Sequence, residues 1–228
     1  MCGRFSFAVS AKKIKETFGE TLELDHDLKI NFNIAPTQDS YVITNDQPQK
    51  LQSFKWGLVP YWANDSSGGG KLINARREGI ENKPSFKTPI KNRRCLVVVD
   101  SFYEWKRLAG QKIPYRIRMK EDQLMVMAGI WDSWTDGKTI VKSFSIITTP
   151  PNREMSTVHN RMPVILETEE VWESWLKDQP LEKVLEILKT PSDGLLDIYR
   201  VSGKVNSVRN NFPELHNRTP ETPTLFDF

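Results

Sequence analysis

The middle of the chain is a series of consecutive segments with β-strand composition, and this feature constrains the fold more than any other. Residues 92–105 (NRRCLVVVDSFYEW) contain the run 95–99, in which every side chain is apolar. Such a run predicts a strand that is buried on both faces. Three more strand-like segments follow, at 113–119, 124–134 and 141–152. Because successive strands with short connections pair antiparallel, we expect a largely antiparallel sheet.

Short helices are predicted around these strands, at 10–19, 168–177 and 180–190. Ser10 and Thr168 are favourable N-caps, and Gly19 suits the position after a helix. The sequence contains no internal repeat and no clear domain boundary. We therefore expect an α+β protein in which a single compact domain, 1–212, contains curved, barrel-like, largely antiparallel sheets with peripheral helices.

Two segments are expected to lack regular structure. The segment NDSSGGG, 64–70, has three consecutive glycines and predicts a mobile surface loop. Residues 213–228 are polar and rich in proline, which predicts a flexible C-terminal tail.

Composition excludes several classes of protein. The 228 residues are 38% hydrophobic and 27% charged, as is ordinary for a globular protein with its own core. No apolar segment reaches the roughly 20 residues that cross a bilayer, and no signal peptide is apparent. We therefore expect a cytoplasmic protein without a membrane partner, whose two cysteines form no disulfide framework. The net charge is only +3, but basic residues cluster at 76–77, 91–94, 106–107 and 116–120.

Cys2 holds the most unusual position, because removal of Met1 would make it the first residue. It would then carry a free α-amine and a thiol on adjacent carbons, with reference pKa values of roughly 7.7–8.0 and about 8.5. Such a 1,2-aminothiol condenses with an aldehyde to a Schiff base and then closes to a thiazolidine. The thiol could instead attack an acyl carbon with the amine as base. If Met1 is retained, Cys2 is a small buried hydrophobe.

Three further side chains carry usable chemistry. The amide of Asn74 can orient a substrate oxygen, although Asn74 also suits a helix N-cap. Glu104 lies between Tyr103 and Trp105 at the end of the buried strand, where desolvation can raise its pKa. His159 is the only one of the three histidines in a favourable context for acid–base catalysis. An ordinary structural role is the alternative for each of them.

No metal or cofactor is indicated. Cys2, Glu104 and His159 could in principle hold zinc, but the sequence lacks the CxxC and HxxxH spacings of structural zinc sites. It also lacks the GxGxxG and Walker motifs of nucleotide-binding proteins.

Eight short motifs occur in order along a resemblance that covers roughly residues 2–210: MCGRF, NIAPTQ, WGLVPYWA, NARREGI, DSFYEWK, MAGIWDSW, ITTPPN and, ending at residue 166, HNRMPVIL. The ordered set resembles the SRAP family, the SOS response-associated peptidase-like proteins that shield abasic sites in single-stranded DNA. The resemblance implies a compact α+β fold and a positively charged cleft for single-stranded DNA, with Cys2 at its floor. It also implies a thiazolidine crosslink between the protein and the ring-opened aldehyde of an abasic site.

The resemblance further implies a role for each matching residue. Cys2 is the nucleophile through its amine and its thiol, and Asn74 holds the opened sugar or positions the amine. Glu104 acts as acid and base, while His159 protonates the sugar hydroxyl and assists reversal. Contacts to DNA are implied for Arg4, Asn33, Pro36, Trp56, Arg76, Thr148, Thr149 and Arg161.

Two other functions stay open at this point. One is a cysteine peptidase or self-processing amidohydrolase that uses Cys2 with Glu104 and His159. The other is a non-covalent DNA-binding module in which Cys2 is incidental. We expect a monomer that associates with the nucleoid when it is bound to DNA. The last residues, TLFDF, either dock on a replication sliding clamp through Leu225 and Phe226 or pack back on the domain.

Overall fold

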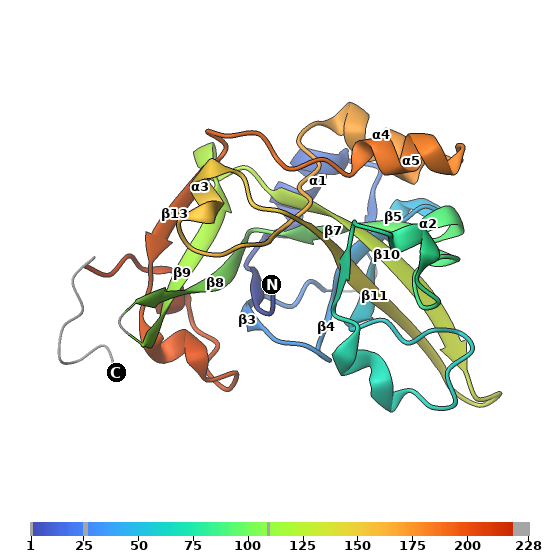
Figure 1. Ribbon diagram of the computed structural model, residues 1–228, viewed down its shortest axis with the longest axis horizontal. Helices are drawn as coiled ribbons and strands as arrows, with labels where there is room; N and C mark the ends of the chain where they lie inside the picture. Colours follow the sequence, from blue (N-terminus) through green and yellow to red (C-terminus); the bar gives the residue numbers. More distant parts are fainter. Residues whose placement is uncertain (1, 25–26, 109, 221–228) are drawn as a thin grey trace.

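The computed structural model describes residues 2–24, 27–108 and 110–220, and its strands form two sheets (Figure 1). The smaller sheet has the strand order β13–β9–β8–β1–β3, with antiparallel pairing throughout. Its strands are β1 (Phe5–Phe7), β3 (Asn31–Ile34), β8 (Ser101–Leu108), β9 (Gln111–Met119) and β13 (Leu196–Arg200).

The larger sheet has the order β12–β11–β10–β7–β4–β5–β2, with β6 attached to β11. Its strands are β2 (Glu23–Leu24), β4 (Asp39–Thr44), β5 (Gln47–Trp56), β6 (Asn74–Arg76), β7 (Arg94–Val99), β10 (Met125–Thr135), β11 (Ile140–Thr149) and β12 (Met162–Pro163). A parallel pairing of β11 with β5 joins the two ends of the series β11–β10–β7–β4–β5. This closure makes a barrel, so the predicted barrel-like α+β fold is confirmed.

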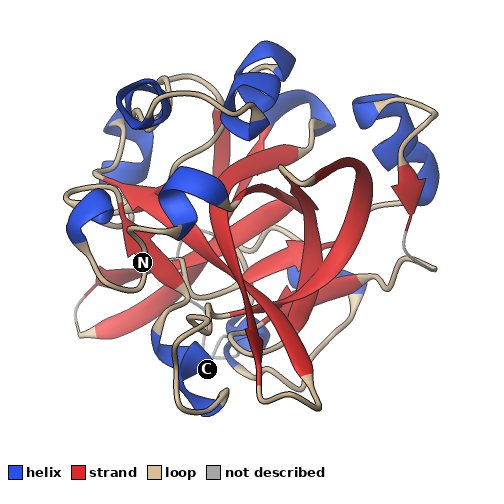
Figure 2. Cartoon of the chain, turned by 90° about the vertical axis from the view of Figure 1, so that its right-hand side faces the viewer, coloured by secondary structure: helices blue, strands red, loops and turns tan. Residues whose placement is uncertain are grey.

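Helices lie around the strands rather than between them (Figure 2). They are α1 (Ala11–Phe18), α2 (Pro89–Asn92), α3 (Arg153–Ser156), α4 (Glu169–Leu176) and α5 (Leu181–Ile187). The predicted N-cap at Ser10 is confirmed, since its hydroxyl accepts a hydrogen bond from the Lys13 amide at 3.1 Å. Within the described ranges, no helix is both long enough and apolar enough to span a membrane.

The predicted strand 92–105 is in fact two strands in different sheets. β7 ends at Val99 in the larger sheet, and β8 begins at Ser101 in the smaller one. Asp100 holds the corner between them, because its carboxylate accepts hydrogen bonds from the Ala8 amide at 2.7 Å and from the Arg116 guanidinium at 2.7 Å. Both partners come from distant parts of the chain, so no local sequence signal could reveal the corner.

Beyond this corner, the side chains of β8 alternate between two cores. Phe102 is buried in the main core, whereas Tyr103 belongs to a second, smaller core on the opposite face of β8. Trp105 packs against this second core and donates from its indole nitrogen to the side chain of Asn206. Glu104 is therefore on the Phe102 face, which points toward the larger sheet.

The C-terminal region is more ordered than expected. Residues Pro213–His216 form a 3-10 turn, and Leu215 is fully buried in the second core. The Pro220 carbonyl accepts a hydrogen bond from the guanidinium of Arg200 in β13 at 2.6 Å. The packed region thus extends beyond 212, and the expectation of a flexible tail now concerns only 221–228. Those residues, including Leu225 and Phe226, lie outside the described ranges.

The triple-glycine loop also has a defined structure, because Ser67–Lys71 form a 3-10 turn. Gly69 is buried where this turn crosses the end of β5, and a Cβ atom at position 69 would lie 2.6 Å from the Gly57 carbonyl oxygen. Gly57 has a φ of +121°, a conformation that favours glycine. The expectation of a freely mobile loop overlooked this contact between two backbone segments, which requires glycine at both 57 and 69.

We expect Gly69→Ala to destabilise the protein by about 1–3 kcal/mol, because the new methyl group has no room. Gly68→Ala is the matched control, since a Cβ at that neighbouring position meets no atom within 4 Å. Thermal unfolding of the two variants measures the difference. Equal melting temperatures would contradict the tight packing of this loop.

Candidate active site

Four separate parts of the chain bring the reactive residues together. Cys2 precedes β1, Asn74 begins β6, Glu104 lies within β8, and His159 is in the loop between α3 and β12. Cys2 lies just before a strand of the smaller sheet, and it is hydrogen-bonded to Asn74 at the start of a strand of the larger one. The site is therefore at the junction of the two sheets.

Asn74 contacts Cys2 directly. Its Nδ2 donates a hydrogen bond of 2.7 Å to the Cys2 carbonyl oxygen. Its Oδ1 is buried and accepts no hydrogen bond from any of the described residues. The parallel pairing of β6 with β11 holds Asn74 opposite Ile146, so the alternative role as a helix cap is wrong. The buried Oδ1 therefore keeps its capacity to accept a hydrogen bond.

The thiol of Cys2 is fully buried, with Sγ 3.9 Å from the Arg4 carbonyl oxygen. Burial, followed by the negative charge of Glu104, raises the pKa of this thiol far above its ordinary value. The thiol therefore stays protonated at neutral pH and needs an acceptor for its proton before it can react. Glu104 is close enough for its charge to act on Sγ, and it is a candidate for that acceptor.

Glu104 and His159 lie together beside Cys2. The Glu104 side chain is only 4% exposed, and its Oε2 is 3.9 Å from Nε2 of His159. The other ring nitrogen, Nδ1, accepts a hydrogen bond of 3.1 Å from the Arg161 amide. Nδ1 also lies 3.3 Å from the Arg161 carbonyl oxygen, but the shorter contact with the amide favours Nδ1 as an acceptor, with the proton of the neutral imidazole on Nε2. The pair can therefore hold and move protons close to Cys2.

A groove of 720 Å³ extends outward from these two side chains. Glu104 and His159 line one part of it, and Lys106, Arg107 and Lys112 line another. Arg107 and Lys112 are register partners in the hairpin of β8 and β9, which places two cations side by side. The sequence showed Lys106 and Arg107 as a cluster, but Lys112 and the hairpin pairing that brings it beside Arg107 were missed.

The structure divides the eight expected DNA contacts into two groups. Arg76 is exposed and Pro36 is half-buried, and both remain candidates for contact. Arg4 is half-buried, and one of its terminal nitrogens donates to Asn33 Oδ1 and to the Val205 carbonyl, each at 2.8 Å. Arg161 is bound to Glu78 through both of its terminal nitrogens.

The other four side chains face the interior, which corrects their expected place on the surface of the cleft. Trp56 is fully buried, with its ring 4.5 Å from that of Phe5 and its indole nitrogen bonded to a backbone carbonyl. The Asn33 amide donates to three carbonyl groups of the segment 205–210. Thr148 and Thr149 are also fully buried in β11. These residues support the site from within.

A sequence model of the SOS response associated peptidase (SRAP) family matches residues 1–208. The chain belongs to the SRAP family. Within it, "Abasic site processing protein YoqW" of Bacillus subtilis (strain 168) is 41% identical over 220 residues, covering 94% of this chain and 98% of that protein. "Abasic site processing protein HMCES" of Pongo abelii is 36% identical over 225 residues, covering 81% of this chain and 64% of that protein.

The fold also matches those of proteins whose structures have been solved. A crystal structure of a Bacteroides thetaiotaomicron protein matches with a TM-score of 0.86 at 28% identity, covering 96% of this SRAP chain and all of the other. Among the residues described for this SRAP protein, no three His, Cys, Asp or Glu side chains group as metal ligands.

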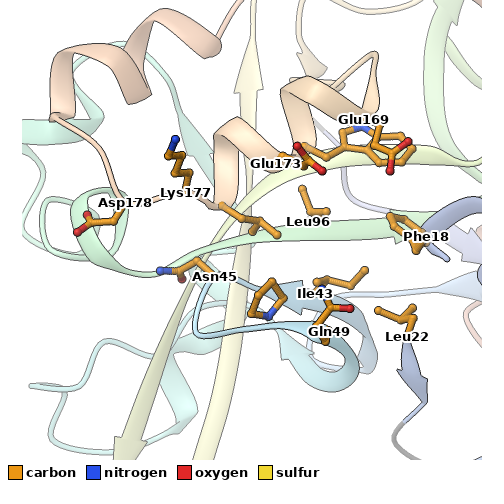
Figure 3. Close-up of a pocket in the computed structure, with 13 residues that line it drawn as sticks. Phe18, Leu22, Ile43, Asn45, Gln49, Leu96, Glu169, Glu173, Lys177 and Asp178 are labelled. Atoms are coloured by element: carbon orange, nitrogen blue, oxygen red, sulfur yellow. The ribbon is translucent and has the colours of Figure 1, made fainter. Parts of the chain in front are cut away.

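A second cavity, of 430 Å³, lies between α4 and the hairpin of β4 and β5 (Figure 3). Ile43 and Leu96 form part of its floor, while Glu169, Glu173 and Asp178 lie along its α4 side. It shares no lining residue with the groove at Glu104. Its three carboxylates make this cavity unfavourable for phosphate groups.

Proposed function

We propose that this SRAP protein captures abasic sites in single-stranded DNA by a covalent bond to Cys2. The observation that carries the proposal is the hydrogen bond from Asn74 to the Cys2 carbonyl, with Glu104 and His159 beside the same residue. Removal of Met1 would create a new chain terminus at Cys2. One orienting amide and two proton carriers would then lie around this terminus. The names of the relatives YoqW and HMCES, abasic site processing proteins, support the same lesion as substrate.

The reaction begins at the amine of Cys2 because the buried thiol is protonated. The ring-opened abasic sugar has an aldehyde at C1′ and a hydroxyl at C4′. The amine nitrogen bonds to C1′, and the aldehyde oxygen leaves as water, which gives a Schiff base. Sulfur then bonds to the same carbon while its proton is passed to nitrogen, and the thiazolidine ring closes. The overall change is the loss of one water molecule.

Each neighbouring side chain has a place in these steps. The buried Oδ1 of Asn74, which accepts no hydrogen bond within the described ranges, accepts one from the freed amine and directs its lone pair. Glu104 takes the thiol proton as the ring closes, and His159 delivers protons to the departing oxygen and to the sugar hydroxyl. Ring closure also removes the Schiff base, from which β-elimination would otherwise cut the DNA strand.

DNA binding in this proposal is mostly electrostatic. The cations of the groove, Lys106, Arg107 and Lys112, and the exposed Arg76 contact backbone phosphates on either side of the lesion. Tyr61 and Trp62, which are 54% and 53% exposed, offer rings on which bases can stack. Binding should therefore weaken steeply with salt and depend little on sequence. Such binding would keep the protein at the nucleoid while it holds a lesion.

The test is a denaturing gel of the protein mixed with a labelled single-stranded oligonucleotide that carries one abasic site. We expect a heat-stable band of slower mobility, and none with the same oligonucleotide lacking the lesion. Cleavage of a peptide substrate without any such band would favour the peptidase alternative. Salt-sensitive binding without a band would favour the non-covalent module.

A further inference from the structure

Glu78 makes a two-pronged ion pair with Arg161. Its Oε1 accepts from Nη1 at 2.7 Å, and its Oε2 accepts from Nη2 at 3.0 Å. The Arg161 side chain is 13% exposed and the Glu78 side chain 49%. The hydrogen bond from Arg161 is the first cause that lowers the pKa of the Glu78 carboxyl. Such a planar pair fixes the direction of the guanidinium as well as its position.

The ion pair crosses β11 at Thr148. Arg76 of β6 lies on one side of this residue in the sheet and Pro163 of β12 on the other. Arg161 reaches over the strand, donating from Nη2 to the Thr148 carbonyl oxygen at 2.7 Å on its way to Glu78. The pair therefore ties the turn after β6 to the loop before β12. These two segments follow Asn74 and His159 closely in the chain.

Arg161 also contacts His159 through its backbone. Its amide donates to Nδ1 of the imidazole at 3.1 Å, whereas its carbonyl oxygen is 3.3 Å from the same nitrogen. The shorter contact favours the imidazole proton on Nε2, which is 3.9 Å from Oε2 of Glu104. A shift of the Arg161 backbone would weaken this bond and allow the proton to move to Nδ1. The imidazole would then present a lone pair instead of a proton to Glu104.

We propose that Glu78 is a positioning residue that acts through Arg161 to hold His159 with its Nε2 proton directed at Glu104. The inference rests on the proposed abasic-site capture, because Glu78 would affect the rate of that reaction. Arg161 keeps a role toward DNA in this arrangement. Among its contacts with described residues, the second N–H of Nη1 has no acceptor, so it can still donate to a phosphate.

A simple electrostatic role for Glu78 makes the opposite prediction. A carboxylate near a DNA cleft repels phosphates, so its removal would strengthen DNA binding and speed capture at low protein concentration. A positioning role predicts slower capture even when every DNA molecule is bound. The rate of adduct formation at saturating protein therefore distinguishes the two roles. The dissociation constant for DNA, measured in parallel, reports only the repulsion between Glu78 and the phosphates.

The experiment compares Glu78→Ala with the wild-type chain in single-turnover adduct formation at saturating protein. We expect the rate to fall about tenfold, the order of effect that follows the loss of a group that orients a functional side chain from behind, with DNA binding no weaker. Glu186→Ala is the matched control, because Glu186 forms an exposed ion pair with Lys183 on α5. This control should react at the wild-type rate.

A double variant shows whether Glu78 acts through His159. If it does, Glu78→Ala should have little further effect in a His159→Gln background, because the group that it positions is gone. A full tenfold loss in that background, or a wild-type rate for Glu78→Ala at saturating protein, would overturn the proposal.

Nitrogen NMR of the imidazoles gives a readout that requires no DNA. The chain has only three histidines, and His159→Gln assigns the signal of His159. At a pH where imidazoles are neutral, we expect the Nε2–H tautomer in the wild-type protein and a shift toward Nδ1–H in Glu78→Ala. An unchanged tautomer would overturn the inference, even if the wild-type protein forms no adduct and the proposed function itself fails.

Discussion

Cys2→Ala is expected to eliminate the heat-stable adduct with abasic-site DNA while leaving DNA binding unchanged. The alanine chain still has a free terminal amine once Met1 is removed, so it can form the Schiff base. It has no sulfur to close the ring, and the Schiff base hydrolyses or decays by β-elimination with strand cleavage. The variant should therefore convert capture into a slow cutting reaction, which the same denaturing gel detects as a shorter DNA fragment.

Cys95→Ala is the matched control for this substitution. Cys95 is the other thiol of the chain, and it is also fully buried with a raised pKa. It lies within β7, where its Sγ would be only 2.8 Å from a Cβ atom at Gly129. Its replacement should cost about 1 kcal/mol of stability and leave the adduct intact. Adduct formation by Cys2→Ala at the wild-type level would exclude Cys2 as the nucleophile.

Glu104→Gln is expected to slow adduct formation by about 100-fold or more, as is typical when a general acid or base is lost. Glutamine keeps the shape of the side chain and removes its ability to exchange a proton. The substitution also removes the negative charge that is the second cause of the raised pKa of the Cys2 thiol. If Glu104 acted only through that charge, its loss would increase the thiolate fraction and speed the reaction.

The direction of the rate change therefore tests the role of Glu104. Single-turnover adduct formation at saturating protein measures it, with the dissociation constant for DNA and the melting temperature as controls for binding and folding. A slower rate with unchanged binding identifies a proton carrier. A rate equal to or above that of the wild-type chain would contradict this assignment.

Local patterns in the sequence predicted the elements that depend on neighbouring residues. The apolar run 95–99 predicted β7, and Ser10 predicted the start of α1. Both predictions were possible because the burial of a strand and the capping of a helix depend on residues within a few positions of each other. The ordered motifs placed Cys2, Asn74, Glu104 and His159 together, and the structure brings all four to one site.

Features that depend on distant contacts could not be predicted in the same way. The corner at Asp100 is fixed by Ala8 and Arg116, and the closure of the barrel is a parallel pairing between β5 and β11. The resemblance implied a DNA contact for Trp56, but its ring packs against Phe5, which is far away in sequence. The pairing of Glu78 with Arg161 was missed for the same reason.

Mass spectrometry of the crosslinked N-terminal peptide tests the central claim most directly. After nuclease and trypsin digestion, residues 2–4 should carry the opened sugar with the loss of one water molecule. The Schiff base has the same mass, but borohydride adds two hydrogen atoms to it and iodoacetamide alkylates its free thiol. We predict a peptide that begins at Cys2 and resists both reagents. A sugar on another residue, a retained Met1, or a product that either reagent changes would contradict the thiazolidine.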